Sequence, residues 1–450
     1  MRGIRSLMVL FTIGLALLAG GIGGVAGSFT DSEDSLANSF LAWTSTQWLQ
    51  TTQADFEAGI PIQADTRSSS DNVVLARDSR IYAFQGGSAS FWAYGVPGNA
   101  WTSMTNAPNA VGTGGALAYD GSRYIYAFRG GGSRTFWRYD TTLGTWQARR
   151  NAPANVGAGG ALSYDGSGYV FALRGNATNA FWRYDIANNV WATMATTPAN
   201  VAAGGALAND GAGYIYALRG NNRAVFWRYD ILNNVWATMA NAPANVGAGG
   251  ALTYDGAAYI YAFRGANRAV FWRYDIGNNS WAAMAAAPAA VGAGGALAYA
   301  GSGYIYGFRG NGTTAFWRYD ALANSWTTMA NALGNVAAGG SLAFVGANTY
   351  VNVATIASQV RDTGTVGATW DALFWDETLP TDNTDITFEV RASDTLFAAD
   401  NATLSWIPVG GTSPVTSGLP SGQYMQWRAT LTTLDIMVTP ILEEVRVYHY

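Results

Sequence analysis

The residue types that carry most enzyme chemistry are scarce in this chain. It has no Cys and no Lys, which excludes disulfides, thiolate metal sites, Cys nucleophiles and Schiff bases. Its single His is His449, so a Ser-His pair or a His-rich metal site would have to rest on a residue beside the C-terminus. The sequence therefore predicts a protein with no catalytic residues, no metal and no cofactor.

Arginine is the charged residue with the most regular spacing, and all 25 basic residues are Arg. Guanidinium groups that recur at the ends of strands could hold carboxylates, sulfates or anionic sugars. The candidate ligand-binding residues are these arginines and polar residues of the loops after them, namely Arg129, Arg174, Arg219, Arg264, Arg309, Arg134, Arg223, Arg268, Asn221 and Asn222. The structural alternative is that each Arg pairs with a repeated Asp, such as Asp210 or Asp230.

Other candidate sites have simpler interpretations. The repeated Trp and Tyr residues could stack on sugars, but their strict spacing favours packing between repeats. Four Asp residues near the C-terminus could bind Ca²⁺, although solvated turns explain them as well: Asp382, Asp385, Asp394 and Asp400. No Glu lies between Asp78 and Gly340, so a sialidase-like Tyr-Glu pair is absent from that stretch.

A repeat of 45 residues organises the centre of the chain. A Phe-Trp pair places its Trp at Trp92, Trp137, Trp182, Trp227, Trp272 and Trp317. A second Trp follows at Trp101, Trp146, Trp191, Trp236, Trp281 and Trp326. Each repeat predicts four short strands separated by turn residues, and in the fourth copy these strands cover 205–208, 214–218, 225–229 and 235–239. Four strands in a unit of this length are typical of a propeller blade.

The repeat resembles the kelch family in Tyr229-Asp230, Asn234 and Trp236, although Arg219 stands where that family usually has Gly. The WD40 pattern fits less well, since no repeat has its Gly-His or Trp-Asp pair. The resemblance implies a six-bladed kelch-like β-propeller. A Gly-Gly-Ala/Ser-Leu segment also occurs six times at the same spacing. Its sixth copy, Gly-Gly-Ser-Leu at 339–342, comes after the last complete repeat, so we expect it to pair with the first repeat and close the ring.

The segments that flank the repeats predict a second all-β unit. Strand-like runs follow residue 348, and Phe388–Asp394 with Gln426–Leu431 resemble a jelly-roll-like module of exported prokaryotic proteins. Residues 56–77 resemble its first strands, so a propeller at 78–348 would be inserted in, or followed by, a β-sandwich completed by 349–450.

The N-terminus predicts export. Two Arg residues precede an apolar run and a small-residue exit, which together describe a signal peptide over 1–27. An uncleaved anchor is the alternative. The residues after it, Ser28–Asp34 and Asn38–Phe40, resemble the signal exit of camelysin-type matrix proteins, which implies the surface of a prokaryotic cell. Residues 28–55 would be a linker or a segment that donates a strand.

These features together predict a secreted or cell-surface protein that is not an enzyme. Its partners would be surface glycans, an anionic polymer or another surface protein, with no nucleic acid and no membrane after signal cleavage. A structural role in an extracellular matrix or envelope is the alternative, because the low-charge segment 40–58 could add a strand to a neighbouring molecule. A glycan hydrolase is the third possibility. The loops after the repeated Arg vary most between copies, which favours that face as the working surface.

Overall fold

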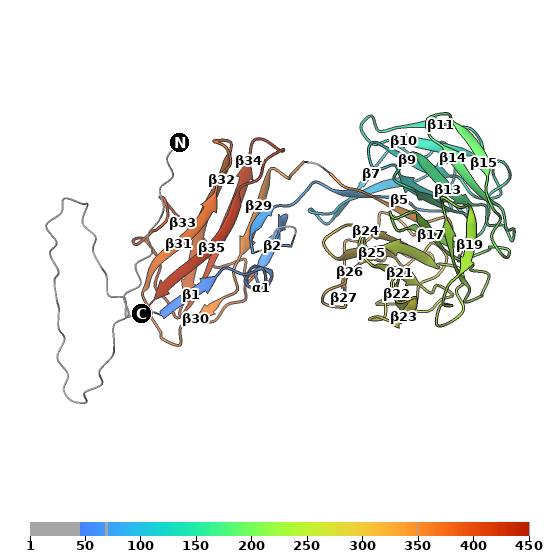
Figure 1. Ribbon diagram of the computed structural model, residues 1–450. Helices are drawn as coiled ribbons and strands as arrows, with labels where there is room; N and C mark the ends of the chain where they lie inside the picture. The colour runs from blue at the N-terminus through green and yellow to red at the C-terminus, as the bar shows by residue number, and fades with distance from the viewer. Residues whose placement is uncertain (1–45, 68–70, 348, 450) are drawn as a thin grey trace, which may run out of the picture. The chain divides into compact units, whose positions relative to one another are not determined.

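The computed structural model describes residues 46–67, 71–347 and 349–449, and in these ranges the chain is almost entirely β-structure (Figure 1). One short helix, α1 (Gln53–Glu57), is present, and its first turn is closed by a capping box between Thr52 and Asp55. Across the same residues, no helix is long and apolar enough to cross a membrane. The expected signal peptide, residues 1–27, lies outside the described residues.

Residues 80–345 form six four-stranded antiparallel sheets. The first sheet consists of β28 (Ser341–Val345), β5 (Arg80–Phe84), β6 (Phe91–Gly95) and β7 (Ala100–Ser103). The next two are β8 (Ala116–Tyr119), β9 (Tyr124–Phe128), β10 (Phe136–Asp140) and β11 (Thr145–Ala148), then β12 (Ala161–Tyr164), β13 (Tyr169–Leu173), β14 (Phe181–Asp185) and β15 (Val190–Thr193).

The last three sheets follow the same order of strands. They are β16 (Ala206–Asn209), β17 (Tyr214–Leu218), β18 (Phe226–Asp230) and β19 (Val235–Thr238); β20 (Ala251–Tyr254), β21 (Tyr259–Phe263), β22 (Phe271–Asp275) and β23 (Ser280–Ala283); and β24 (Ala296–Tyr299), β25 (Tyr304–Phe308), β26 (Phe316–Asp320) and β27 (Ser325–Thr328). The strands expected from the repeat are therefore present, with bounds that differ by about one residue.

The turns of each sheet depend on polar residues at fixed positions. In the fourth repeat the Asp210 carboxylate accepts hydrogen bonds from the backbone N–H groups of Ala212 and Tyr214, at 2.8 and 3.0 Å. Asn234 has a φ of 55°, a left-handed conformation that Asn tolerates better than most residues. Asp210 thus acts as a turn residue.

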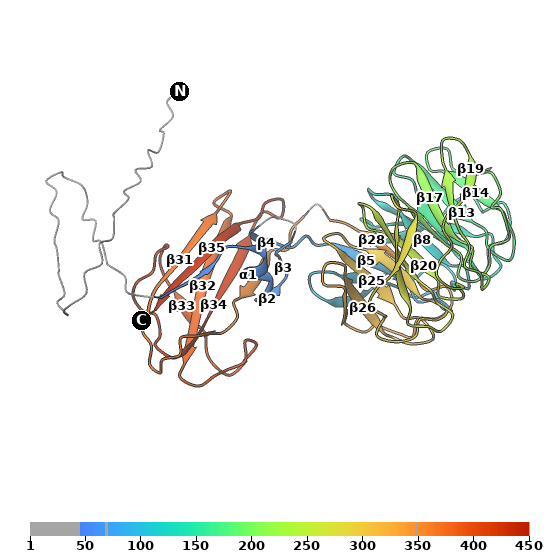
Figure 2. The same cartoon turned by 60° about the horizontal axis from the view of Figure 1, so that its bottom comes forward.

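The first strands of the six sheets neighbour one another in a closed cycle, and β28, β8 and β20 lie near its centre in Figure 2. The cycle closes because β28 pairs with β5, with Ser341 opposite Phe84. This confirms the expectation that the last Gly-Gly-Ser-Leu segment completes the first repeat. Repeated four-stranded sheets in this arrangement are typical of a β-propeller.

Glycine pairs allow the first strands to approach closely. A Cβ on Gly205 would lie 2.8 Å from the carbonyl oxygen of Gly159 in the preceding sheet, and a Cβ on Gly204 would overlap the backbone of Gly247 in the following one. The same contacts recur at the other first strands, including Gly339 against Gly112 across the closure. The repeated glycines are therefore required by backbone packing.

The repeated Tyr, Asn and Trp residues form the outer seam between neighbouring sheets. The Tyr229 hydroxyl donates to Asn234 Oδ1 at 2.7 Å, and the same oxygen accepts from the N–H of Ala195 in the preceding sheet at 2.8 Å. Trp236 Nε1 donates to the Ala195 carbonyl at 2.9 Å. Tyr, Asn and Trp are therefore repeated because each sheet binds the previous one through them.

The flanking segments combine into two further sheets. One joins β1 (Thr46–Gln50), β35 (Ile441–His449), β4 (Val73–Leu75) and β3 (Ala64–Asp65), with β31 (Trp370–Thr378) also paired to β35. The other joins β2 (Ile60–Ile62), β29 (Val353–Ala357), β34 (Tyr424–Thr433), β32 (Thr384–Ser393) and β33 (Ile407–Val409), with β30 (Arg361–Asp362) paired to β34. In Figure 1 the blue β1 therefore runs beside the red β35.

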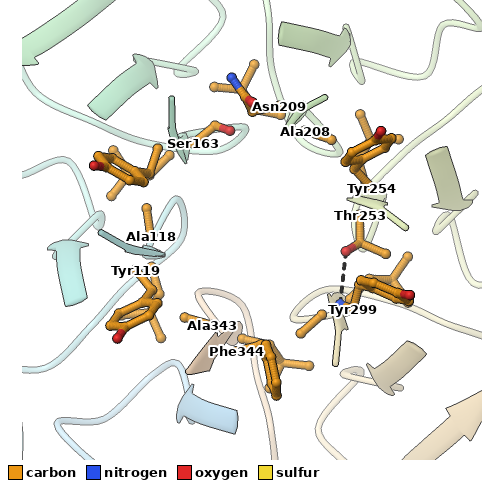
Figure 3. A pocket seen from close by; sticks show the side chains of 18 of the residues that line it. Ala118, Tyr119, Ser163, Ala208, Asn209, Thr253, Tyr254, Tyr299, Ala343 and Phe344 are labelled. Carbon is orange, nitrogen blue, oxygen red and sulfur yellow. Dashed lines mark hydrogen bonds between the residues drawn. The ribbon is translucent and has the colours of Figure 1, made fainter. Parts of the chain in front are cut away.

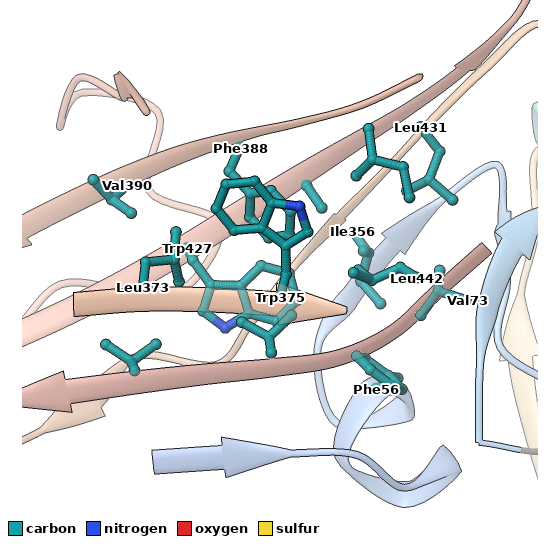
Figure 4. Packing of buried hydrophobic residues seen from close by; sticks show 14 of the residues in the cluster. Phe56, Val73, Ile356, Leu373, Trp375, Phe388, Val390, Trp427, Leu431 and Leu442 are labelled. Atoms are coloured by element: carbon teal, nitrogen blue, oxygen red, sulfur yellow. The ribbon is translucent and has the colours of Figure 1, made fainter. Parts of the chain in front are cut away.

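A single core fills the space between these two sheets. Trp375, Phe388 and Trp427 lie at its centre (Figure 4), and Trp427 Nε1 donates to Gln50 Oε1 at 2.7 Å. Two expectations are corrected here. Residues 46–50, assigned to a linker or donated strand, form β1 in the chain's own sheet, and Phe56 lies in α1 rather than in a strand, with its ring buried in the core.

Candidate functional site

The axis of the cyclic sheets contains a cavity of about 380 Å³. Its wall consists of three layers of side chains contributed by the six first strands (Figure 3). The deepest layer is Leu117, Leu162, Leu207, Leu252, Leu297 and Leu342; the next is Ala118, Ser163, Ala208, Thr253, Ala298 and Ala343; and the last is Tyr119, Tyr164, Asn209, Tyr254, Tyr299 and Phe344. A cavity of this size fits a small ligand.

Aromatic rings surround the mouth of the cavity, which we call the tyrosine end of the axis. In Figure 3 the hydroxyl groups of Tyr119, Tyr254 and Tyr299 point away from the centre, so ring carbons rather than hydroxyls face the opening. Turn glycines lie beside the rings, since a Cβ on Gly256 would be in ordinary van der Waals contact with the Tyr299 ring, at 3.6 Å. The mouth is therefore a collar of half-buried aromatic surface.

Backbone polar groups also face the axis. Asp120 N–H donates to the Tyr124 carbonyl within its own sheet. In an antiparallel ladder, successive residues direct their N–H groups to opposite edges of the strand. The N–H groups of Leu117 and Tyr119 therefore point away from the neighbouring strand and toward the axis. In two strands such N–H groups donate to hydroxyls of the neighbouring first strand: Leu117 to Ser341 at 3.1 Å, and Tyr299 to Thr253 at 3.0 Å. A ligand in the cavity thus meets strand edges that can hydrogen-bond to it.

The charges that act on the mouth are carboxylates. None of the described residues that line the cavity is charged. Burial raises the pKa of Tyr119, and the neighbouring Asp120 carboxylate raises it further. The pKa of Tyr254 is raised in the same way by burial and then by Asp255 and Asp210. These tyrosines therefore stay neutral at ordinary pH, and the local field disfavours an anionic ligand.

The repeated arginines lie outside this cavity and bind backbone instead. Each Nε donates to a carbonyl of the connection that leads into the first strand of the arginine's own sheet. The pairs are Arg129 with Ala110, Arg174 with Asn155, Arg219 with Asn200, Arg264 with Asn245 and Arg309 with Ala290, all between 2.9 and 3.1 Å. In the first repeat Gln85 Nε2 donates to Asn335 at 3.0 Å. The structure differs from the alternative of Arg–Asp pairing for Arg219: its Nε binds the Asn200 carbonyl, while the Oδ1 atoms of Asp210 and Asp230 accept turn N–H groups.

The other predicted ligand residues are parts of the loops after the second strands. Asn221 and Asn222 have φ values of 54° and 53°, so their side chains follow a left-handed turn. Arg134 Nε donates to the Ala152 carbonyl at 2.8 Å. Arg223 and Arg268 form backbone bridges with Val246 and Val291 in the connection after the fourth strand. All ten predicted residues are absent from the cavity wall.

The remaining candidates in the flanking sheets have structural surroundings. The Asp394 carboxylate accepts backbone hydrogen bonds from Gly367 and Gln423, at 2.6 and 3.0 Å. The His449 ring is buried 5.0 Å from Trp370, and burial lowers its pKa. Within the described ranges, no group of three or more His, Asp or Glu side chains could hold a metal ion.

Sequence reasoning did not identify the cavity. Its residues alternate as in any half-buried strand, and only ring closure turns one edge of each strand toward an axis. A signal was nevertheless present, because the Tyr of the first strand is replaced by Asn at 209 and by Phe at 344, whereas the Gly-Gly pair and the Leu before it are constant.

Comparisons with known proteins add little to this description. No family model and no curated protein matches the chain. Among solved structures, one titled "Structure of YjhT" aligns with a TM-score of 0.43 at 14% sequence identity, over 57% of this chain and 93% of that one. The fold class therefore rests on the sheets themselves: an all-β protein with propeller-like repeats.

Proposed function

We propose that this chain is an exported surface protein that binds a glycan without catalysis, and that the axial cavity is its binding site. The observation that carries the proposal is the cavity of about 380 Å³ whose mouth is ringed by Tyr119, Tyr164, Tyr254, Tyr299 and Phe344. Sugars combine apolar ring faces with hydroxyl edges, and this wall combines aromatic carbon with strand-edge N–H and C=O groups.

The scaffold in this proposal is a six-bladed kelch-like propeller inserted into a β-sandwich. The six sheets, the closed cycle of first strands and the Tyr-Asn-Trp seam support the propeller. Strands from both sides of the repeats share two sheets and one core, which supports the insertion. Such an insertion is geometrically simple because the two ends of a closed ring are adjacent.

The ligand class follows from the charges at the mouth. Anionic sugars and polymers would enter beside Asp120, Asp165, Asp210 and Asp255 without a cationic lining residue. Burying a charge without a partner is costly, so a neutral sugar fits this wall better. The guanidinium groups proposed earlier as anion ligands have Nε committed to backbone carbonyls. We therefore place recognition at the tyrosine end rather than on the arginine loops.

The surface location and the partner remain part of the proposal. They rest on the signal-like residues 1–27 and the camelysin-like segment after them, both outside the described residues. The matrix alternative has lost part of its support, because residues 46–50 already pair with β35 and cannot also donate that strand to a neighbour.

The test is a screen of neutral glycans with the secreted full-length protein. Changing Tyr164→Ala and Tyr254→Ala together removes two collar rings, and we expect at least a tenfold loss of affinity for any glycan that binds. The matched control is Arg174→Ala with Arg264→Ala, which alters the same two sheets at the arginine loops. Loss of binding in the control, with binding retained in the tyrosine variant, would overturn the assignment of the site.

A further inference from the structure

The series of tyrosines around the collar is interrupted at two opposite points. Counting around the six first strands, Asn209 and Phe344 are three positions apart, and Figure 3 shows them facing each other across the opening. Two tyrosines separate them on either side. The collar therefore has a polar point at Asn209 and an apolar point at Phe344, although the four residues between them repeat.

The layer beneath the collar has the same polarity. Its two hydroxyl residues, Ser163 and Thr253, belong to the strands on either side of Asn209, whereas Ala298, Ala343 and Ala118 lie on the strands beside and including that of Phe344. Apart from the two tyrosines on each side, one half of the wall carries an amide, two hydroxyls and the methyl group of Ala208, and the other half carries the Phe344 ring and three methyl groups.

The polar half has hydrogen-bonding capacity to offer. Asn209 Oδ1 accepts from Gly211 N–H at 2.5 Å, while its buried Nδ2 has no hydrogen-bond partner within the described residues. Thr253 Oγ1 accepts from Tyr299 N–H, which directs the hydroxyl hydrogen elsewhere. Because Nδ2 has almost no accessible surface, the polar side-chain groups that this half offers to a ligand oxygen are the hydroxyls of Ser163 and Thr253.

From this division we infer that the cavity selects a neutral sugar carrying a methyl-terminated substituent. The hydroxyl edge of the sugar would lie against Asn209, Ser163 and Thr253, and the methyl group against Phe344 and Ala343. A deoxysugar methyl and an acetamido methyl share this chemistry. The inference rests on the proposed function, since it specifies the ligand of that same cavity.

Matched sugar pairs test the selection. L-Fucose is compared with L-galactose, and N-acetylglucosamine with glucose, by calorimetric titration of the full-length protein. We expect the methyl-bearing member of at least one pair to bind roughly fourfold more tightly or better, the ratio that corresponds to about 0.8 kcal/mol for one buried methyl. The two pairs distinguish a deoxysugar from an acetamido sugar.

Reciprocal substitutions locate the selectivity. Phe344→Asn gives both points an amide, and we expect the preference for the methyl-bearing sugar to disappear. Asn209→Phe makes both points apolar, and we expect weaker binding of both members with the preference kept. Because Phe344 lies in the closing strand, Ala343→Ser provides a milder variant that adds one hydroxyl to the apolar half and should reduce the preference.

The outcomes separate the two proposals. Equal binding of both members of each pair by the unaltered protein would overturn the selection but leave the cavity as a sugar site. An unchanged preference in both Phe344→Asn and Ala343→Ser would also overturn it. Absence of binding by either member to the folded protein, with no hit in the wider screen, would overturn the proposed function and this inference together.

Discussion

The two ends of the axis differ in the groups that lie between neighbouring first strands. At the glycine end, formed by the Gly-Gly pairs that begin each first strand, backbone touches backbone, as Gly205 does at Gly159. At the tyrosine end, the same strands diverge enough to hold side chains, and those side chains differ from one strand to the next. One set of six strands is therefore close-packed at one end and open at the other.

This difference shows which variation between repeats carries information about function. The glycine end tolerates no variation because any Cβ would meet a neighbouring backbone. The arginine loops vary, but within residues that adopt left-handed turns, such as Asn221 and Ala266. Variation at the tyrosine end, from Tyr to Asn209 or Phe344, changes side chains that line the cavity. We therefore connect that variation with a ligand.

The largest expected effect is steric. Gly204 has a φ of 88°, and a Cβ there would overlap the Gly247 backbone, whereas Gly211 at the tyrosine end has a φ of 68° and nothing within 4 Å. We expect Gly204→Ala to lower the free energy of unfolding by more than about 3 kcal/mol, from left-handed strain and overpacking together. Gly211→Ala should cost about 1 kcal/mol, from conformation alone. Equal losses in urea unfolding would remove the contrast between the two ends.

The next expected effect concerns the outer seam between neighbouring sheets, which belongs to neither the glycine end nor the tyrosine end. Gly144 stands where other repeats have the seam Asn, and the Tyr139 hydroxyl is buried without a partner in the described part of the chain. Its φ of 67° suits Asn, and a Cβ would lie 3.6 Å from that hydroxyl. We expect Gly144→Asn to stabilise the protein by about 1 kcal/mol, seen as a higher midpoint of thermal unfolding. Gly144→Ala is the control and should destabilise it.

The smallest expected effect concerns the arginine loops. Arg219→Ala removes the hydrogen bond from Nε to the Asn200 carbonyl, and we expect a loss of about 0.5–1 kcal/mol in unfolding free energy. Sugar affinity should be unchanged, because Arg219 does not line the cavity. A clear loss of ligand binding with unchanged stability would transfer the binding site to that face and reverse the comparison.

Much of the fold could be predicted because the constant spacing of the repeat shows which residues are equivalent in each copy. The strands around Trp227 and Trp236 differ from their predicted bounds by about one residue, and the pairing of 341–345 with β5 followed from counting first strands. The partner of Arg219 could not be predicted, because strand twist decides whether a guanidinium reaches a turn Asp or a loop carbonyl. The role of Thr46–Gln50 was also missed, since its partner β35 lies almost 400 residues later.

The cavity was missed for a different physical reason. Leu207 and Ala208 look like ordinary alternating strand residues, and whether they face a packed core or an open axis depends on how many strands surround that axis. Neither the hydropathy pattern nor the residue spacing specifies the number of strands that surround the axis. The interruptions at Asn209 and Phe344 acquire meaning only when the cycle brings them face to face.

The pairing of β28 with β5 also constrains when the cycle of sheets can close. Ser341, Leu342 and their neighbours are synthesised after every other strand of the cycle, so the last interface cannot form until the whole repeat segment has emerged. Leu342, Ala343 and Phe344 belong to that strand, and all three line the cavity. The cavity wall is therefore incomplete until this strand has been synthesised, and a chain truncated before residue 341 would lack Leu342, Ala343 and Phe344.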